Sequence, residues 1–290
     1  MMDSFYYKVA DHVFALNVEG DHLGDLWQYE PFRTEPADDV VFRLETVGEL
    51  PVARFHEMFR QEDKGQTILA GHTDTGEPYF EFLLGKVRSA VLLTSADYRV
   101  GRFLVKDNWT FSVNNALMIM YALSTSNSRT ALFHSSVVAC QGRAYMFLGK
   151  SGTGKSTHSS LWLKHVPGAE LLNDDNPVVR ILDNNEVRVY GSPWSGKTPC
   201  YRNLSCPLGA IVKLRQAPYN RMERIKGVNA YVTIMPSISG KRWDSSLAAG
   251  IHKTESLLAE LVPIWRLECR PDEAAVLLCR DQCICLERKK

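Results

Sequence analysis

Residues 149–157 of the sequence read Gly149-Lys150-Ser151-Gly152-Thr153-Gly154-Lys155-Ser156-Thr157. This stretch fits the pattern G-x-x-x-x-G-K-S, the phosphate-binding loop or P-loop. The run before it, Arg143 to Leu148, is apolar and aromatic and predicts a strand. The residues after it, Ser156 to His165, have the composition of a helix start. The motif therefore lies between a strand and a helix N-terminus, where its binding mechanism requires it.

Each residue type in the loop has a physical role. The glycines let the backbone wrap around an anion without Cβ clashes, and the exposed N–H groups and the helix dipole face phosphates. Lys155 supplies a cation for the β- and γ-phosphates, and Ser156 supplies a hydroxyl for Mg²⁺. A chance glycine turn would not also carry Lys-Ser between a strand and a helix. The sequence therefore predicts ATP and Mg²⁺ as cofactors, with the whole of 149–157 at the nucleotide.

Two acidic residues, Asp174 and Asp175, end the next predicted strand, which begins at Ala169. The spacing from Lys155 leaves room for one helix, a turn and a strand, so both strands should end at the same edge of a sheet. Acids at that edge can hold Mg²⁺ and take a proton from an attacking hydroxyl. The alternative is an Asp-rich turn before Pro177. Because adjacent strand residues point to opposite sides, the two acids should do different jobs.

Four further segments complete the second half. Leu132 to Cys140 predicts a strand that pairs antiparallel with the strand before the P-loop. Gly191 to Asn203 predicts a long specific loop, whose Lys197 either meets phosphate or substrate charge or is solvated. Ala217 to Arg224 predicts a turn that enters a helix, and Leu247 to Val262 an amphipathic helix.

The first part of the chain, residues 1–112, predicts a small β-rich domain with an antiparallel sheet. Its short β-like runs are separated by turn residues, and Asp74 to Pro78 predicts a hairpin. Asn114 to Leu123 predicts a helix that opens the second domain, 113–290. Packing, dimerisation and substrate docking all remain open as roles for the first domain.

The composition limits the possible partners. The 290 residues carry a net charge of +1, so no global field draws the chain to nucleic acid or to an anionic membrane. The apolar run Ala116 to Leu123 is too short to span a bilayer, and residues 1–8 lack the apolar core of a signal peptide. Seven cysteines cannot all pair within one chain. We therefore expect a cytoplasmic protein with free thiols, and a homo-oligomer is compatible with these observations.

The stretch from His134 to Arg180 resembles the catalytic domain of HPr kinase/phosphorylase. His134, the P-loop strand, the loop itself and Ala169 to Asp175 follow the order and approximate spacing of that family. The string Ser151 to Thr157 and the paired acids also resemble the ATP-dependent phosphoenolpyruvate carboxykinases, which share the fold. The loop Gly191 to Lys197 is similar to one in the HPr-kinase-related proteins of bacteria.

This resemblance implies an α/β fold, with a P-loop kinase domain of the HPr kinase/phosphoenolpyruvate carboxykinase type after the small β-rich domain. It implies that Lys155 and the loop amides bind the ATP phosphates, and that Ser156 and Asp175 hold Mg²⁺. It further implies that Asp174 is the general base and that His134 lies beside the active site.

Three functions follow as hypotheses. The first is an ATP/Mg²⁺-dependent kinase that phosphorylates a hydroxyl of a protein, peptide or small molecule. The second is a carboxykinase-like lyase acting on oxaloacetate, which the absence of identifiable substrate arginines disfavours. The third is a regulatory nucleotide-binding module without turnover, which the paired acids disfavour.

Overall fold

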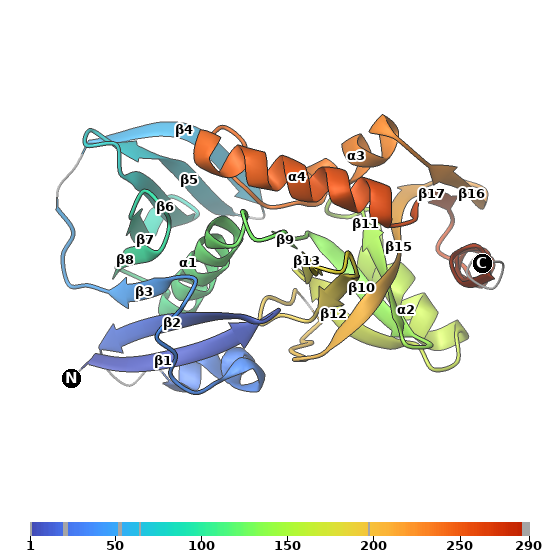
Figure 1. The fold of residues 1–290 in the computed structure, drawn as a ribbon, viewed down its shortest axis with the longest axis horizontal. Coiled ribbons are helices and arrows are strands. Elements are labelled where there is room, and N and C mark those ends of the chain that lie inside the picture. The colour runs from blue at the N-terminus through green and yellow to red at the C-terminus, as the bar shows by residue number, and fades with distance from the viewer. Residues whose placement is uncertain (1, 20–22, 52–53, 64, 197, 286–290) are drawn as a thin grey trace. The chain divides into compact units, whose positions relative to one another are not determined.

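The chain divides into two compact units, Met1–Thr125 and Ser126–Lys290, each built around its own β-sheet (Figure 1). The structure is a computed structural model, and it describes residues 2–19, 23–51, 54–63, 65–196 and 198–285. The protein is thus mixed α/β with two sheets, which confirms the α/β class expected from the sequence.

The first unit contains an eight-stranded sheet with the order β1-β2-β3-β8-β7-β6-β5-β4. Its elements are β1 (Met2–Val9), β2 (His12–Glu19), the 3-10 helix η1 (Leu23–Phe32), β3 (Arg43–Thr46), β4 (Phe55–Asp63), β5 (Gln66–Thr73), β6 (Pro78–Leu84), β7 (Val87–Thr94) and β8 (Val100–Val105). The hairpin expected at Asp74 to Pro78 is confirmed, because β5 and β6 pair antiparallel across it. The sheet is larger than expected and not wholly antiparallel, since β3 pairs parallel with both β2 and β8.

Helix α1 (Trp109–Ser124) begins one turn earlier than the predicted Asn114, after Asn108 in a left-handed conformation. The hydroxyl of Tyr121 donates a hydrogen bond of 3.0 Å to the carbonyl oxygen of Val9. The helix is counted with the first sheet, so the chain divides after it rather than at the expected 112/113 boundary. Its buried side chains include Val113, Ala116, Leu117 and Met120.

The second unit contains a nine-stranded sheet with the main order β12-β10-β11-β15-β14-β13-β9. Its strands are β9 (Thr130–Leu132), β10 (Ser135–Cys140), β11 (Arg143–Leu148), β12 (Glu170–Asp175), β13 (Val178–Ile181), β14 (Val187–Tyr190), β15 (Ser205–Gln216), β16 (Arg221–Ile225) and β17 (Ile264–Cys269). Its helices are α2 (Lys155–His165), α3 (Val228–Ile234), the 3-10 helix η2 (Met235–Ser237), α4 (Ser245–Leu261) and α5 (Glu273–Cys285). The predicted antiparallel pair before the loop is confirmed as β10 and β11.

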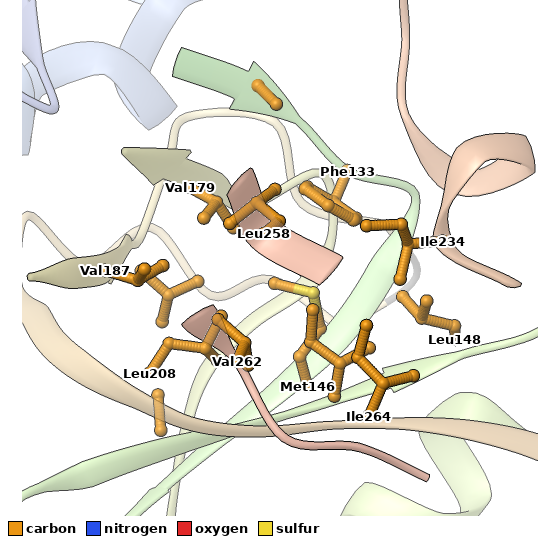
Figure 2. Packing of buried hydrophobic residues seen from close by; sticks show 14 of the residues in the cluster. Phe133, Met146, Leu148, Val179, Val187, Leu208, Ile234, Leu258, Val262 and Ile264 are labelled. Atoms are coloured by element: carbon orange, nitrogen blue, oxygen red, sulfur yellow. The ribbon is translucent and has the colours of Figure 1, made fainter. Parts of the chain in front are cut away.

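Helices cover both faces of this sheet. On one face, Trp162 of α2 and Val276 of α5 pack with Phe147 of β11. On the other face, Ile234 of α3 and Leu258 of α4 belong to the cluster in Figure 2. Successive side chains of β11 point to opposite faces, because Met146 and Leu148 belong to the second cluster and Phe147 belongs to the first.

In the C-terminal part, one predicted helix is confirmed and another predicted helix is a strand. The amphipathic helix expected from Leu247 is confirmed as α4, which begins after the N-cap Asp244. The residues expected to enter a helix, up to Arg224, instead form β16, which pairs antiparallel with β17. Among the described residues, no helix has the length and apolar character needed to cross a bilayer.

His158 on α2 is buried in this unit, and burial lowers its pKa to about 4. The unfolded chain, with a histidine pKa near 6.5, therefore binds more protons than the folded chain between these values. The free energy of unfolding should have its full value above that range, and it should fall by about 3 kcal/mol as the pH drops through the range. His158→Gln, which keeps an acceptor for the Trp162 indole N–H now 3.2 Å from His158 Nε2, should flatten this acid loss.

The measurement is denaturant unfolding followed by tryptophan fluorescence between pH 7 and pH 4. The matched control is His252→Gln, because the His252 side chain on α4 is 47% exposed. This control should retain the acid loss of the wild type. Equal acid sensitivity in wild type and His158→Gln would contradict the prediction.

Candidate functional site

The ends of three strands meet at one edge of the second sheet. Ser135, the first residue of β10, pairs with Leu148 on one side and with Asp175 on the other. Since β10 runs antiparallel to both neighbours, β11 and β12 end level with each other at this edge. The chain leaves β11 there to form the glycine-rich loop and returns through α2 and β12 to the paired acids. The sequence-based expectation of a shared edge is therefore confirmed.

The loop itself is shaped by its glycines. Gly152 and Gly154 have φ angles of +80° and +103°, a left-handed region that favours glycine. A Cβ built on either residue would meet no atom within 4 Å, so the space beside both positions is open. Gly149, by contrast, packs against the Thr153 side chain, which would lie 2.9 Å from an added Cβ. The loop thus turns tightly at its base and is open around its later glycines.

Three of the predicted site residues are in direct contact. The Lys155 ammonium lies 3.0 Å from His134 Nε2 and donates a second hydrogen bond, also 3.0 Å, to the carbonyl oxygen of Gly149. His134 Nδ1 lies 3.1 Å from Asp175 Oδ1. Because an ammonium can only donate, Nε2 accepts, and the ring donates its Nδ1–H to Asp175. A continuous polar chain therefore joins the loop lysine to the acid at the end of β12.

The two acids lie on opposite faces of β12. Asp174 pairs in register with Ser136, whose hydroxyl is 2.6 Å from that of Ser159 on α2. Directly opposed residues of an antiparallel pair share a face, so Asp174 lies on the α2 side and is only 6% exposed. Asp175 contacts His134 from the other face, and its side chain is 35% exposed. The sequence-based expectation of opposite orientations is confirmed.

The loop after β14 runs directly beside both acids. Its Gly196 N–H donates a 2.9 Å hydrogen bond to the carbonyl oxygen of Asp174, and an added Cβ on Gly196 would lie 2.8 Å from that oxygen. The loop is anchored by Ser192, which receives a hydrogen bond from the buried Asn173 side chain at 3.2 Å. Lys197, the predicted substrate residue of this loop, lies outside the described residues.

The oxygen donors at this edge suit a magnesium–nucleotide complex. Mg²⁺ prefers oxygen ligands and binds through one or two carboxylates together with substrate phosphates. Asp175 and the exposed Ser156 offer such oxygens. Within the described ranges, no cluster of three or more His, Cys, Asp or Glu side chains could hold a metal alone. The buried Ser135 hydroxyl has no hydrogen-bond partner within the described part of the chain, which leaves one polar atom here unsatisfied. The residues therefore fit Mg²⁺ held together with phosphates.

Sequence reasoning missed a basic pocket on the other side of the loop. This cavity has a volume of about 830 Å³. It is lined by Lys150, Ser151, Gly152, Thr153, Lys213, Leu214, Arg215, Gln216, Val232, Thr233, Pro236 and Arg266. The available signal was the run Lys213 to Gln216, a charged end to an otherwise buried strand.

Comparison with solved structures finds weak likeness to a known kinase/phosphatase. No family model matches the sequence, and no curated protein matches it either. The solved structure of the HPr(Ser) kinase/phosphatase from Coxiella burnetii is similar with a TM-score of 0.30 and 12% identity, over 55% of this chain and 96% of that chain. A likeness of this size does not establish a family or an activity.

Proposed function

We propose that the protein is an ATP- and Mg²⁺-dependent kinase that transfers the γ-phosphoryl group to a hydroxyl of a protein, peptide or small molecule. The observation that carries the proposal is the contact chain from Lys155 through His134 to Asp175 at the mouth of the glycine-rich loop. A regulatory binding module needs the loop and its lysine, but it does not need a second acid on the opposite face of the same strand.

We assign the metal to Asp175. In a P-loop the lysine contacts the β- and γ-phosphates, and a bound Mg²⁺ ion would neutralise charge on the same groups. Asp175 is separated from Lys155 by a single imidazole, so we place its carboxylate beside that position. Ser156, next to Lys155 in the first turn of α2, supplies the second protein oxygen.

We assign Asp174 to the acceptor. Asp174 is shielded from water and adjoins Gly196 in the loop that we assign to the acceptor site. A carboxylate in such a place can orient the attacking hydroxyl and accept its proton, while Lys155 and His134 hold the polar groups around the transferred phosphoryl. Bound Mg·ATP supplies the phosphoryl group and neutralises its charge during transfer.

Incubation of the protein with γ-labelled ATP and cell extract tests this proposal. We expect label on a protein, peptide or metabolite, and we expect Asp174→Asn to slow its appearance by roughly 10²–10⁴-fold. Oxaloacetate-dependent release of carbon dioxide would instead favour the lyase hypothesis. Nucleotide binding without any release of γ-phosphate would favour the regulatory hypothesis.

A further inference from the structure

The basic pocket lies on the side of the loop away from the paired acids. In the sheet order, β12 and β10 flank β11 on one side, and β15 follows β11 on the other. Lys213 of β15 pairs in register with Leu148 at the end of β11 and with Arg266 of β17. The last residues of β15 therefore extend beside the loop, and Gln216 donates its side-chain N–H to the carbonyl oxygens of Gly152 (3.3 Å) and Thr153 (3.4 Å).

The cations of this pocket share one face of the sheet. Leu214 belongs to the cluster under α2 and α5, so its neighbours in β15 point to the opposite face, toward α3. Residues paired in register on adjacent strands point the same way, which places Arg266 beside Lys213. Val232 and Thr233 of α3 line this side of the pocket.

The pocket carries positive charge that the protein does not balance. Arg215 pairs with Glu268 at 3.0 Å and Arg266 pairs with Glu223 at 2.9 Å, so both arginines are neutralised locally. Lys150 and Lys213 have no carboxylate partner in the described part of the chain. Burial lowers the pKa of Lys213, and the nearby charge of Lys150 lowers it further. Two ammonium groups that line one pocket without a counter-charge are the chemistry of an anion site.

The size and lining of the pocket favour a whole small molecule over an isolated ion. A volume of about 830 Å³ lies within the usual range for small-molecule sites. Val232 and Pro236 add apolar surface beside the charged groups. A purine base would use the apolar surface but would bring no charge to the two lysines.

We propose that this pocket binds an organic phosphate, whose phosphate group lies between Lys150 and Lys213, at the same time as the loop holds the nucleotide. We leave the triphosphate to the other side of the loop, where Lys155 contacts His134 and His134 contacts Asp175. Lys150, which the sequence grouped with the nucleotide loop, is assigned instead to the pocket that it lines. The pocket is thus a second phosphate site. Only the simultaneous binding of nucleotide rests on the proposed function.

The experiment uses phenyl phosphate as the probe, because it combines a phosphate with an apolar ring. Calorimetric titrations of the full chain are run without nucleotide and with saturating Mg²⁺ and a non-hydrolysable ATP analogue. We expect phenyl phosphate to bind in both conditions, and more tightly than inorganic phosphate. Lys213→Met should weaken this binding by roughly 10–100-fold, the value of a charge-assisted contact, while Lys213→Arg retains it.

Two controls keep the outcome interpretable. Lys253→Met removes an exposed lysine from α4 and should leave phenyl phosphate binding unchanged. Lys150→Met removes the other lysine of the site and should also weaken phenyl phosphate binding. If one of the two variants folds poorly, the other still gives the test. Displacement of phenyl phosphate by the nucleotide analogue would show that its phosphate enters the nucleotide site and would overturn the proposal. Binding that ignores both lysines would overturn it as well. If the analogue does not bind at all, the kinase proposal fails. The effect of the two lysine variants on phenyl phosphate binding without nucleotide still decides whether the pocket is a phosphate site.

Discussion

Asp174→Asn is expected to leave Mg·ATP binding near normal and to lower phosphoryl transfer by roughly 10²–10⁴-fold, the contribution of a positioned general base. The physical reason is that Asp174 lies buried on the α2 side of β12, beside the loop that carries Gly196. Asparagine keeps the shape of the side chain but cannot accept a proton from the attacking hydroxyl. Turnover with γ-labelled ATP, together with nucleotide affinity, measures the effect.

Asp175→Asn is the matched control, because it makes the same chemical change one residue later. It should raise the Mg²⁺ concentration needed for activity, since Asp175 is the acid joined to Lys155 through His134. A metal titration of both variants separates the roles. An exchange of the two phenotypes would reverse the assignment, and full activity in both would reduce the acidic pair to a turn.

Lys155→Met is expected to lower turnover by roughly 10²–10³-fold, the cost of removing one donor aimed at developing charge. The ammonium lies at the N-terminus of α2, where it is held by the Gly149 carbonyl oxygen and by His134. Methionine keeps the length of the side chain but removes this charge. Lys164→Met removes an exposed lysine from the last turn of the same helix and should leave turnover unchanged. Equal losses in the two variants would point to a general effect of charge on the unit.

Most of the loop region could be predicted from the sequence because its signals are local. The strand before the loop, the loop glycines and the helix after it are contiguous, and each has a distinct chemistry. The spacing to Asp174 and Asp175 fixed a second strand ending at the same edge. The alternation of strand side chains then placed the two acids on opposite faces.

The errors arose where the deciding partner is distant in sequence. Helix α1 has a clear apolar face, but that face does not say which sheet it covers, and the chain divides after the helix at Thr125. The polar residues of β16 suggested a turn and a helix, yet Glu223 forms an ion pair with Arg266 on the neighbouring strand. An edge strand with cross-strand ion pairs lacks the apolar alternation that marks a strand in the sequence.

The basic pocket was missed for the same reason. Lys150, Lys213 and Arg266 are separated by long stretches of chain and meet only because β15 pairs parallel with both β11 and β17. Parallel strands are joined by long connections, so no short turn in the sequence indicates that they pair. His134 is the opposite case. The resemblance to HPr kinase/phosphorylase indicated it as a site residue, and it contacts both Lys155 and Asp175.

The most direct test of the central claim, that the loop at 149–157 is a nucleotide site, is a calorimetric titration with ATP in the presence and absence of Mg²⁺. We expect Mg²⁺-dependent binding with a Kd between roughly 1 μM and 1 mM, the range usual for cellular substrates, and weaker binding by Lys155→Met. No detectable binding of ATP or of a non-hydrolysable analogue in either condition, by a wild type that is folded, would contradict it.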